Sequence, residues 1–318
     1  MRAFRIALAA LCISLPALAQ DFPSRPVHII VPYTPGTGAD ILARLIGPKL
    51  GERWKVGVPT DNKPGATGNI GAEFVAKAEP DGHTLLFVAT SFGTTPALQK
   101  QLPFDPVKSF EPVALIATSG LVVVVNPKVP ARSMKELIAL TKRQPGQMHY
   151  SSPGNGGPQH LAMELIKLET GMSIVHVPYK AAAGALADVV GGHVDATVAA
   201  VQTAHPHVQS GRLRALAVMS LERSSAYPDV PTMKEQGLPD LEVETWYAAF
   251  APANMPSQII QKLNSDINAV LRDAQVREAI EKQGMSPVGG TPQRLAELVK
   301  NEIPRWTRVV AAAGIKAD

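Results

Sequence analysis

Two glycine-rich loops, far apart in the chain, have the composition of anion-binding sites. The first is YTPGTG at residues 33–38, which follows an apolar run at 27–31. The second is SSPGNGGPQH at residues 151–160. A helix is expected to start directly after each loop, so unpaired backbone N–H groups and the positive end of the helix dipole would point outward. Such a site can bind a carboxylate without any basic side chain.

An ordinary strand-to-helix turn would also use glycine here, because glycine adopts positive φ at little steric cost. For either loop alone, that alternative stays open. Pro158 stands near the first position of the second helix, where its missing N–H costs nothing. The occurrence of the same pattern in two places favours the anion-binding interpretation.

Polar side chains near these loops could reach a bound ligand. Asp40 stands where a helix start favours an acid, and it could instead pair with a ligand ammonium. His160 lies one turn into its helix and could contact the ligand or anchor the loop. Ser91 and Thr95 follow the strand expected at 84–89, so they could meet the distal end of the ligand or cap a helix.

Three further candidates follow strand ends in the second half of the chain. Tyr179 and Lys180 come after a strand expected at 174–177, and Gln202 comes after one at 194–199. Lys180 is the best candidate for a charged contact with the distal end of the ligand, although exposed lysines are usually only solvated. Gln202 is expected to line the same cleft.

The elements that must position these groups alternate between strands and helices, which predicts an α/β fold with mostly parallel sheets. The first half is expected to contain strands at 27–31, 54–60 and 84–89, and residues 90–96 are expected to form a loop. A second series starts at 148–151, and His205 and His207 are expected in a surface loop.

The order of elements further predicts two lobes joined by two hinge crossovers. Two apolar runs, 113–117 and 121–125, are split by Thr118-Ser119-Gly120 and would form the first crossing. A strand at 246–251 would form the second. The expected lobes are 20–121 with 252–318, and 122–251. Ligands of open α/β sheets bind beyond the carboxyl ends of the strands, which here means between the lobes.

The N-terminus has the features of an export signal. Arg2 and Arg5 precede an apolar stretch at 6–15 and the motif Ala17-Leu18-Ala19, so we expect a signal peptide at 1–19, with cleavage before Gln20. The single cysteine, Cys12, lies within it. No apolar run reaches the roughly 18 residues that a membrane span needs. Removing Arg2 and Arg5 lowers the formal net charge from +4 to +2, which argues against nucleic-acid binding.

Enzyme interpretations find little support in the sequence. The chain lacks the motifs G-x-S-x-G, H-E-x-x-H and G-x-x-x-x-G-K. A dinucleotide site is disfavoured because Ile41 occupies the third glycine position after Gly36 and Gly38. A hydrolase that uses Ser151 or Ser152 with His160 remains an open alternative, because a triad depends on spatial geometry. The sequence predicts no catalytic residue, no metal site and no cofactor.

Many stretches, taken together and in order, resemble the Bug family of extracytoplasmic solute receptors, which serve tripartite tricarboxylate transporters. The resemblance covers essentially all of the chain after the signal. The matching stretches include RPVHIIVPYTPGTGADILARLIGPKL, DNKPGATGNIGAEFVAKAEPDGHTLL, YSSPGNGGPQHLAMELIK and VHVPYKAAAGALADVVGGHVDA. The chain departs from the family pattern at Thr37 and at residues 181–183, both near the expected pocket.

The resemblance implies a two-lobe, Venus-flytrap receptor in the periplasm that closes on a small carboxylate, either a dicarboxylate or an aromatic acid. It implies delivery to a membrane permease of the tripartite tricarboxylate type, and we expect a monomer. A sensor that reports to a membrane kinase is the alternative partner assignment. Carried over from the family, the ligand contacts are Tyr33, Thr37 and Gly38 on one side, and Ser152, Asn155 and Gly156 on the other.

Overall fold

The computed structural model describes residues 22–99 and 101–315. The predicted signal peptide, Cys12 and the cleavage position before Gln20 lie outside the described residues. Within the described ranges, no helix has both the length and the apolar character that crossing a membrane requires.

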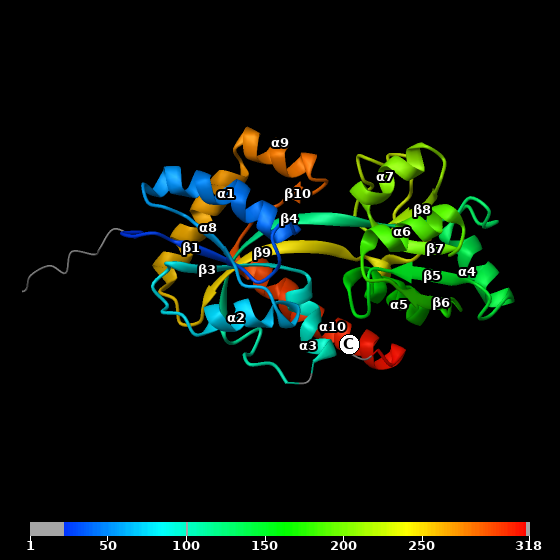
Figure 1. Cartoon of the computed structure of the whole chain (residues 1–318), viewed down its shortest axis with the longest axis horizontal. Coiled ribbons are helices and arrows are strands. Elements are labelled where there is room, and N and C mark those ends of the chain that lie inside the picture. Colours follow the sequence, from blue (N-terminus) through cyan, green and yellow to red (C-terminus); the bar gives the residue numbers. More distant parts are fainter. Residues whose placement is uncertain (1–21, 100, 316–318) are drawn as a thin grey trace, which may run out of the picture.

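The protein has two α/β lobes that lie side by side and are joined by long strands (Figure 1). In each lobe, parallel strands form one side of the sheet, and antiparallel strands complete it at the junction. The first lobe contains β1 (His28–Val31), β2 (Thr60–Asn62), β3 (Thr84–Ala89), β9 (Glu244–Pro252) and β10 (Ser286–Pro287). The second contains β5 (His149–Ser152), β6 (Val175–Pro178), β7 (Ala196–Ala200) and β8 (Arg214–Val218). The two-lobe prediction is therefore confirmed.

Strand β4 (Phe110–Val125) belongs to both lobes and is continuous over 16 residues. Residues 110–120 pair with β9, whereas residues 121–125 pair with β7 and β8. Thr118-Ser119-Gly120, which separate the two apolar runs in the sequence, do not interrupt the strand. Although these small polar residues are typical of a turn, their backbone stays extended because Thr118 is paired with Trp246 and Gly120 with Glu244.

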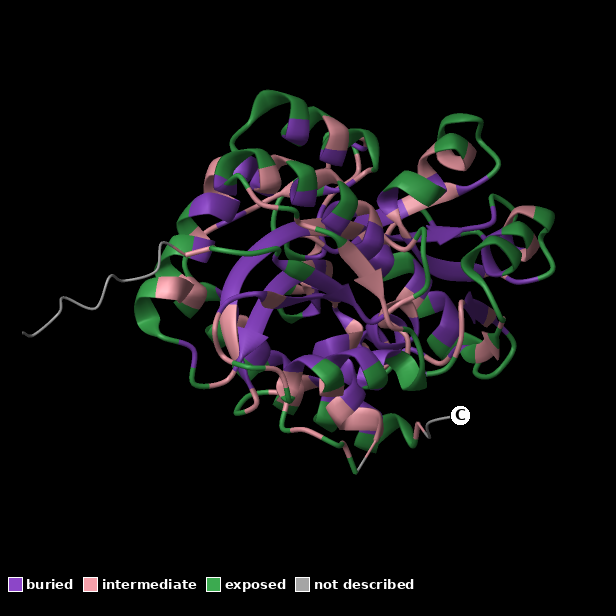
Figure 2. Ribbon diagram, turned by 60° about the vertical axis from the view of Figure 1, so that its left-hand side comes forward, coloured by how far each residue is buried: buried purple, intermediate pink, exposed green. Residues whose placement is uncertain are grey.

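Helices cover both faces of each sheet, and the buried residues lie on the strands and on the inner parts of the helices (Figure 2). The first lobe has α1 (Gly38–Trp54), α2 (Asn69–Ala76), α3 (Ser91–Leu98), α8 (Ser257–Leu271), α9 (Ala274–Lys282) and α10 (Pro292–Ala313). The second lobe has α4 (Met134–Arg143), α5 (Pro158–Thr170), α6 (Ala182–Gly191) and α7 (Val201–Gln209).

Three local predictions are wrong. The strand predicted at 54–60 begins only at Thr60, because α1 continues to Trp54, whose side chain is buried in the first-lobe core. Residues 91–98 form α3 and residues 201–209 form α7, where loops were predicted. Each of these helices contains a proline, but each also buries apolar side chains against its sheet and is stabilised by that packing.

Helix α10 packs against both lobes. Leu295 and Val299, in its first half, belong to the core between the first-lobe sheet and α2 and α3. Trp306, Val309 and Val310, in its second half, belong to the core of the second lobe. The C-terminal helix therefore provides a third connection between the lobes, in addition to β4 and β9.

The position of the second crossing follows from the strand pairing. Strand β9 pairs with β3 and with the first-lobe part of β4 along its length, whereas Val243 packs in the second-lobe core. We propose that the chain crosses between Val243 and Glu244, beside the first crossing at 120–121. The sequence-based limits, 20–121 with 252–318 and 122–251, place this crossing some residues later.

Replacement of Trp306 by alanine tests the role of α10. Because Trp306 is fully buried, we expect Trp306→Ala to lower the free energy of unfolding by about 3–5 kcal/mol in denaturant titrations. Arg308→Ala, on the same helix, removes only an exposed ion pair with Glu169 and should cost less than about 1 kcal/mol. Equal effects of the two changes would contradict the packing of α10 on the second lobe.

Candidate functional site

The two glycine loops lie at the carboxyl edges of the two sheets, where the lobes meet. The first loop follows β1 and leads into α1, and the second follows β5 and leads into α5. Leu98 of α3, in the first lobe, lies against Gly156 of the second loop, so tightly that a side chain on Gly156 would overlap it. The loops predicted from the sequence are therefore brought to one inter-lobe region, as expected for open α/β sheets.

Asp40 holds the first loop in place. It is 3% exposed, and its carboxylate accepts hydrogen bonds from Gly36 N (2.9 Å), Asn62 Nδ2 (2.9 Å) and Arg44 Nε (3.0 Å). Burial raises the pKa of this carboxyl, but the bonds from Arg44, Gly36 and Asn62 outweigh burial and hold the pKa below its ordinary value. The structural interpretation of Asp40 is thus favoured, and its contact with a ligand stays a prediction.

The start of α1 has backbone donors beside Tyr247. Thr37 is the N-cap residue, but its hydroxyl donates to Thr34 O at 3.0 Å and makes no cap bond to the helix. The first N–H groups of the helix, from Gly38 onward, have no intrahelical acceptor. Unpaired N–H groups at a helix start can bind an anion, and ligand contact at Thr37 and Gly38 stays a prediction.

The hydroxyl of Tyr33 is used within the protein. It lies 2.8 Å from Ser91 Oγ and accepts from Ala89 N at 3.2 Å. Burial raises its pKa, which the bonds from Ser91 and Ala89 partly offset. Tyr33 and Ser91 are therefore bonded to each other, and the contact of either residue with a ligand stays a prediction.

Tyr247, on β9, is a site residue that the sequence analysis missed. Its hydroxyl lies against Gly38, where a Cβ would come within 2.6 Å of Tyr247 Cζ. No hydrogen bond ties this hydroxyl to any of the described residues, and burial raises its pKa, so it stays protonated. The composition of 246–251 indicated a strand, but the position of Tyr247 at the carboxyl edge depends on β9 running antiparallel to β3.

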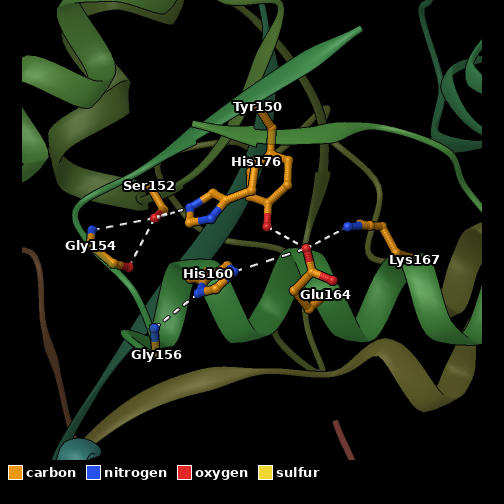
Figure 3. Close-up of polar contacts among 8 residues, drawn as sticks. All are labelled: Tyr150, Ser152, Gly154, Gly156, His160, Glu164, Lys167 and His176. Atoms are coloured by element: carbon orange, nitrogen blue, oxygen red, sulfur yellow. Dashed lines mark hydrogen bonds and ion pairs between the residues drawn. The ribbon is translucent and has the colours of Figure 1, made fainter. Parts of the chain in front are cut away.

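Two histidines fix the second loop (Figure 3). Gly156 N donates to His160 Nδ1 at 2.9 Å, and Ser152 Oγ lies 2.7 Å from His176 Nε2. Ser152 is fully buried, and its hydroxyl also contacts Gly154 O at 3.0 Å and Gly154 N at 3.3 Å. The structure therefore pairs Ser152 with His176, and His160 has the loop-anchoring role that was one of its two predicted alternatives.

Behind these histidines lies a buried acid. Glu164 accepts from Tyr150 Oη and from Lys167 Nζ, each at 2.6 Å. Burial and the Glu164 charge raise the pKa of Tyr150 far above its ordinary value. Burial, followed by the repulsion that a protonated His160 would exert, lowers the pKa of His176 to about 4. The only sequence signal for His176 is a polar residue between Val175 and Val177 in a short strand.

The remaining candidate residues differ in their exposure and in their hydrogen-bond partners. Asn155 is exposed on the second loop, and Lys180 is exposed after β6. The Tyr179 hydroxyl donates to Asp188. Gln202 faces the hinge, because its Oε1 accepts from Ser119 Oγ at 3.1 Å. Among the described residues, no group of three or more His, Cys, Asp or Glu is placed to hold a metal ion.

Comparison with known proteins identifies the family. The profile of the family described as "Tripartite tricarboxylate transporter family receptor" matches residues 42–315. Protein BugT of Bordetella pertussis is 36% identical over 313 residues, which make up 98% of this chain and 96% of BugT. The chain belongs to the tripartite tricarboxylate transporter receptor family. The resemblance to Bug proteins is thereby confirmed, and this receptor belongs to a family of solute-binding proteins, not enzymes.

Two solved structures of similar receptors contain carboxylates. Rpa4515 of R. palustris, with adipate, is 34% identical to this receptor, with a TM-score of 0.76 and coverage of 93% of this chain and 99% of that chain. MatC of Rhodopseudomonas palustris, with bound malate, is 31% identical to this receptor, with a TM-score of 0.73. The match covers 91% of this chain and 100% of MatC.

The change Asp40→Asn tests how the first loop is held. An amide cannot accept all the bonds that the carboxylate accepts, so we expect a loss of about 1–3 kcal/mol in unfolding free energy at pH 7. Because the folded pKa of Asp40 lies below its ordinary value of 3.8, its contribution is complete above that pH and is lost as the pH falls through the folded pKa. The difference in unfolding free energy between wild type and Asp40→Asn should therefore become smaller as the pH falls below 3.8.

A matched control is Asp61→Asn, which alters an exposed pair with His28 and should cost less than about 1 kcal/mol at pH 7. Chemical denaturation from pH 7 to pH 2.5 would measure both variants. An Asp40→Asn difference that stays constant down to pH 2.5 would show that the carboxylate is not what holds the loop.

Proposed function

We propose that this receptor is a periplasmic protein that captures a small carboxylate between its lobes and delivers it to a permease of the tripartite tricarboxylate type. The observation that carries the proposal is the start of α1, where the first backbone N–H groups lie beside the Tyr247 hydroxyl, which makes no hydrogen bond to the residues that the structure describes. Backbone donors and a neutral hydroxyl can hold a carboxylate without a basic side chain. The adipate and malate in two relatives support the ligand class.

In this proposal, one ligand carboxylate lies between the two loops. Thr37, Gly38 and Tyr247 contact it from the first lobe, and Asn155 and the backbone near Gly156 contact it from the second. The far end of the ligand extends toward the loop after β6, where Lys180 could pair with a second carboxylate. A dicarboxylate would use Lys180, whereas an aromatic acid would not. Closure of the lobes then buries the ligand, and a monomer suffices for binding.

A panel of acids tests the proposal. Adipate, malate, succinate and benzoate, each compared with its amide, would be added to receptor that has been unfolded and refolded to remove carried-over ligand. An acid at about one hundred times its dissociation constant should stabilise the fold by about 2.7 kcal/mol, which is visible as a rise in melting temperature. The amides should give no rise. No rise with any acid in a broader carboxylate panel would contradict the proposal.

Two tyrosine-to-phenylalanine changes test the ligand contact. Tyr247→Phe removes the free hydroxyl, so we expect about tenfold weaker binding of the acid and an unchanged melting temperature without ligand. Tyr33→Phe removes a hydroxyl bonded to Ser91 and Ala89, so it should lower the stability of the ligand-free receptor by about 1 kcal/mol. Calorimetric titration and thermal unfolding measure the two effects. Unchanged affinity in Tyr247→Phe would remove Tyr247 from the site.

A further inference from the structure

The second loop is held near both of its ends by imidazoles that come from different elements. His176, on β6, contacts Ser152 at the start of the loop, and His160, on α5, contacts Gly156 near its end. The two rings are stacked face to face, with centroids 3.8 Å apart and an interplanar angle of 11° (Figure 3). The anchors of the loop are therefore in direct contact with each other.

The bond to Gly156 sets the protonation state of His160. The backbone N–H is a donor, so Nδ1 of His160 must accept and carries no proton. The ring is then neutral, with its proton on Nε2, which lies 4.0 Å from Glu164 Oε1. Protonation of Nδ1 would leave the Gly156 N–H, which is buried, without this acceptor.

The contacts of Ser152 set the tautomer of His176. Gly154 N can only donate to the Ser152 hydroxyl, and Gly154 O can only accept from it. All three contacts are satisfied together when Nε2 of His176 carries a proton and donates to Ser152 Oγ. His176 is neutral at pH 7, since burial, together with His160 and Lys167, lowers its pKa to about 4 while Glu164 opposes that shift.

We propose that His160 and His176 form one positioning unit, which holds the second ligand loop only while His160 is neutral. This inference rests on the proposed function, because it assigns the loop a ligand to receive. The rings face Glu164 and Lys167 on α5 and are flanked by the stacked ring of Tyr150 on β5. From the first lobe, the apolar side chain of Leu98 on α3 contacts Gly156.

The consequence is a link between protonation and ligand binding. The loop requires positive φ at Gly154 (151°) and at Gly156 (70°), so its shape depends on contacts that hold it in place. If His160 gains a proton, Gly156 N–H loses its acceptor and a charge appears against the face of His176. We therefore expect carboxylate affinity to fall as the pH is lowered from 7 toward 4, by release of the loop.

The test begins with the ligand-free receptor, so that it does not depend on the identity of the ligand. At pH 7, ¹⁵N NMR of the histidine side chains should show both rings neutral, with the proton on Nε2. In His160→Leu, the amide of Gly156 should exchange with solvent about tenfold faster than in wild type. The amide of Met219, which donates to Leu121 O in the hinge, is the reference for global stability and should be unchanged.

His160→Asn is the matched control, because its side-chain oxygen can take the place of Nδ1 and should restore slow exchange at Gly156. Binding of adipate and malate is then measured at pH 7 and pH 4.5. His160→Leu should bind about tenfold more weakly at pH 7, and His160→Asn should bind nearly as wild type and lose less affinity at pH 4.5 than wild type does.

The two kinds of failure are distinguishable. A charged ring at pH 7, or Gly156 exchange that is equal in wild type and His160→Leu, would overturn the positioning unit whatever the ligand. If wild type binds neither adipate nor malate, the NMR and exchange measurements alone test whether His160 and His176 hold the loop. The acid panel then tests the proposed function separately. Equal acid sensitivity in wild type and His160→Asn would overturn the link to protonation.

Discussion

The antiparallel pairing of β4 with β9 is the constraint on which the rest of the structure depends. One strand, β4, supplies backbone partners to both sheets, and β9 joins β3 to it in the first lobe. Because β4 is continuous, the two sheets share one line of hydrogen bonds, and the carboxyl edges of their parallel strands are brought to the same inter-lobe region. The shared strand β4 therefore fixes the position of the first-lobe candidate contacts relative to those of the second lobe.

Most polar groups around the two loops bond to the protein itself. Asp40 fixes the first loop, and His160 with His176 fixes the second. Buried polar groups are costly unless they are paired, so these bonds determine loop shape before any ligand arrives. In the proposed site, the ligand would mainly meet the backbone at the start of α1, the Tyr247 hydroxyl and the exposed side chain of Lys180. A binding site made this way can select anions on a nearly neutral protein.

The sequence predicted the elements that carry their own local signals. Glycine loops after apolar runs placed the starts of α1 and α5 correctly, because strand, turn and helix start each depend on nearby residues. The continuity of β4 could not be predicted, since Thr118-Ser119-Gly120 is extended only through its pairing with β9. The roles of Tyr247 and His176 could not be predicted either, because they depend on strand direction and on a ring stacked from another element.

The packing of α10 on both lobes gives the hinge a preferred direction. A receptor held only by two strands could twist or slide as well as close. Here the lobes are also bridged by apolar side chains of α10, with Leu295 in one core and Trp306 in the other. Sliding the lobes apart would expose those side chains to water, whereas a rotation about the helix would keep them buried. We therefore expect the lobes to rotate about α10 and the junction to open on the side away from this helix.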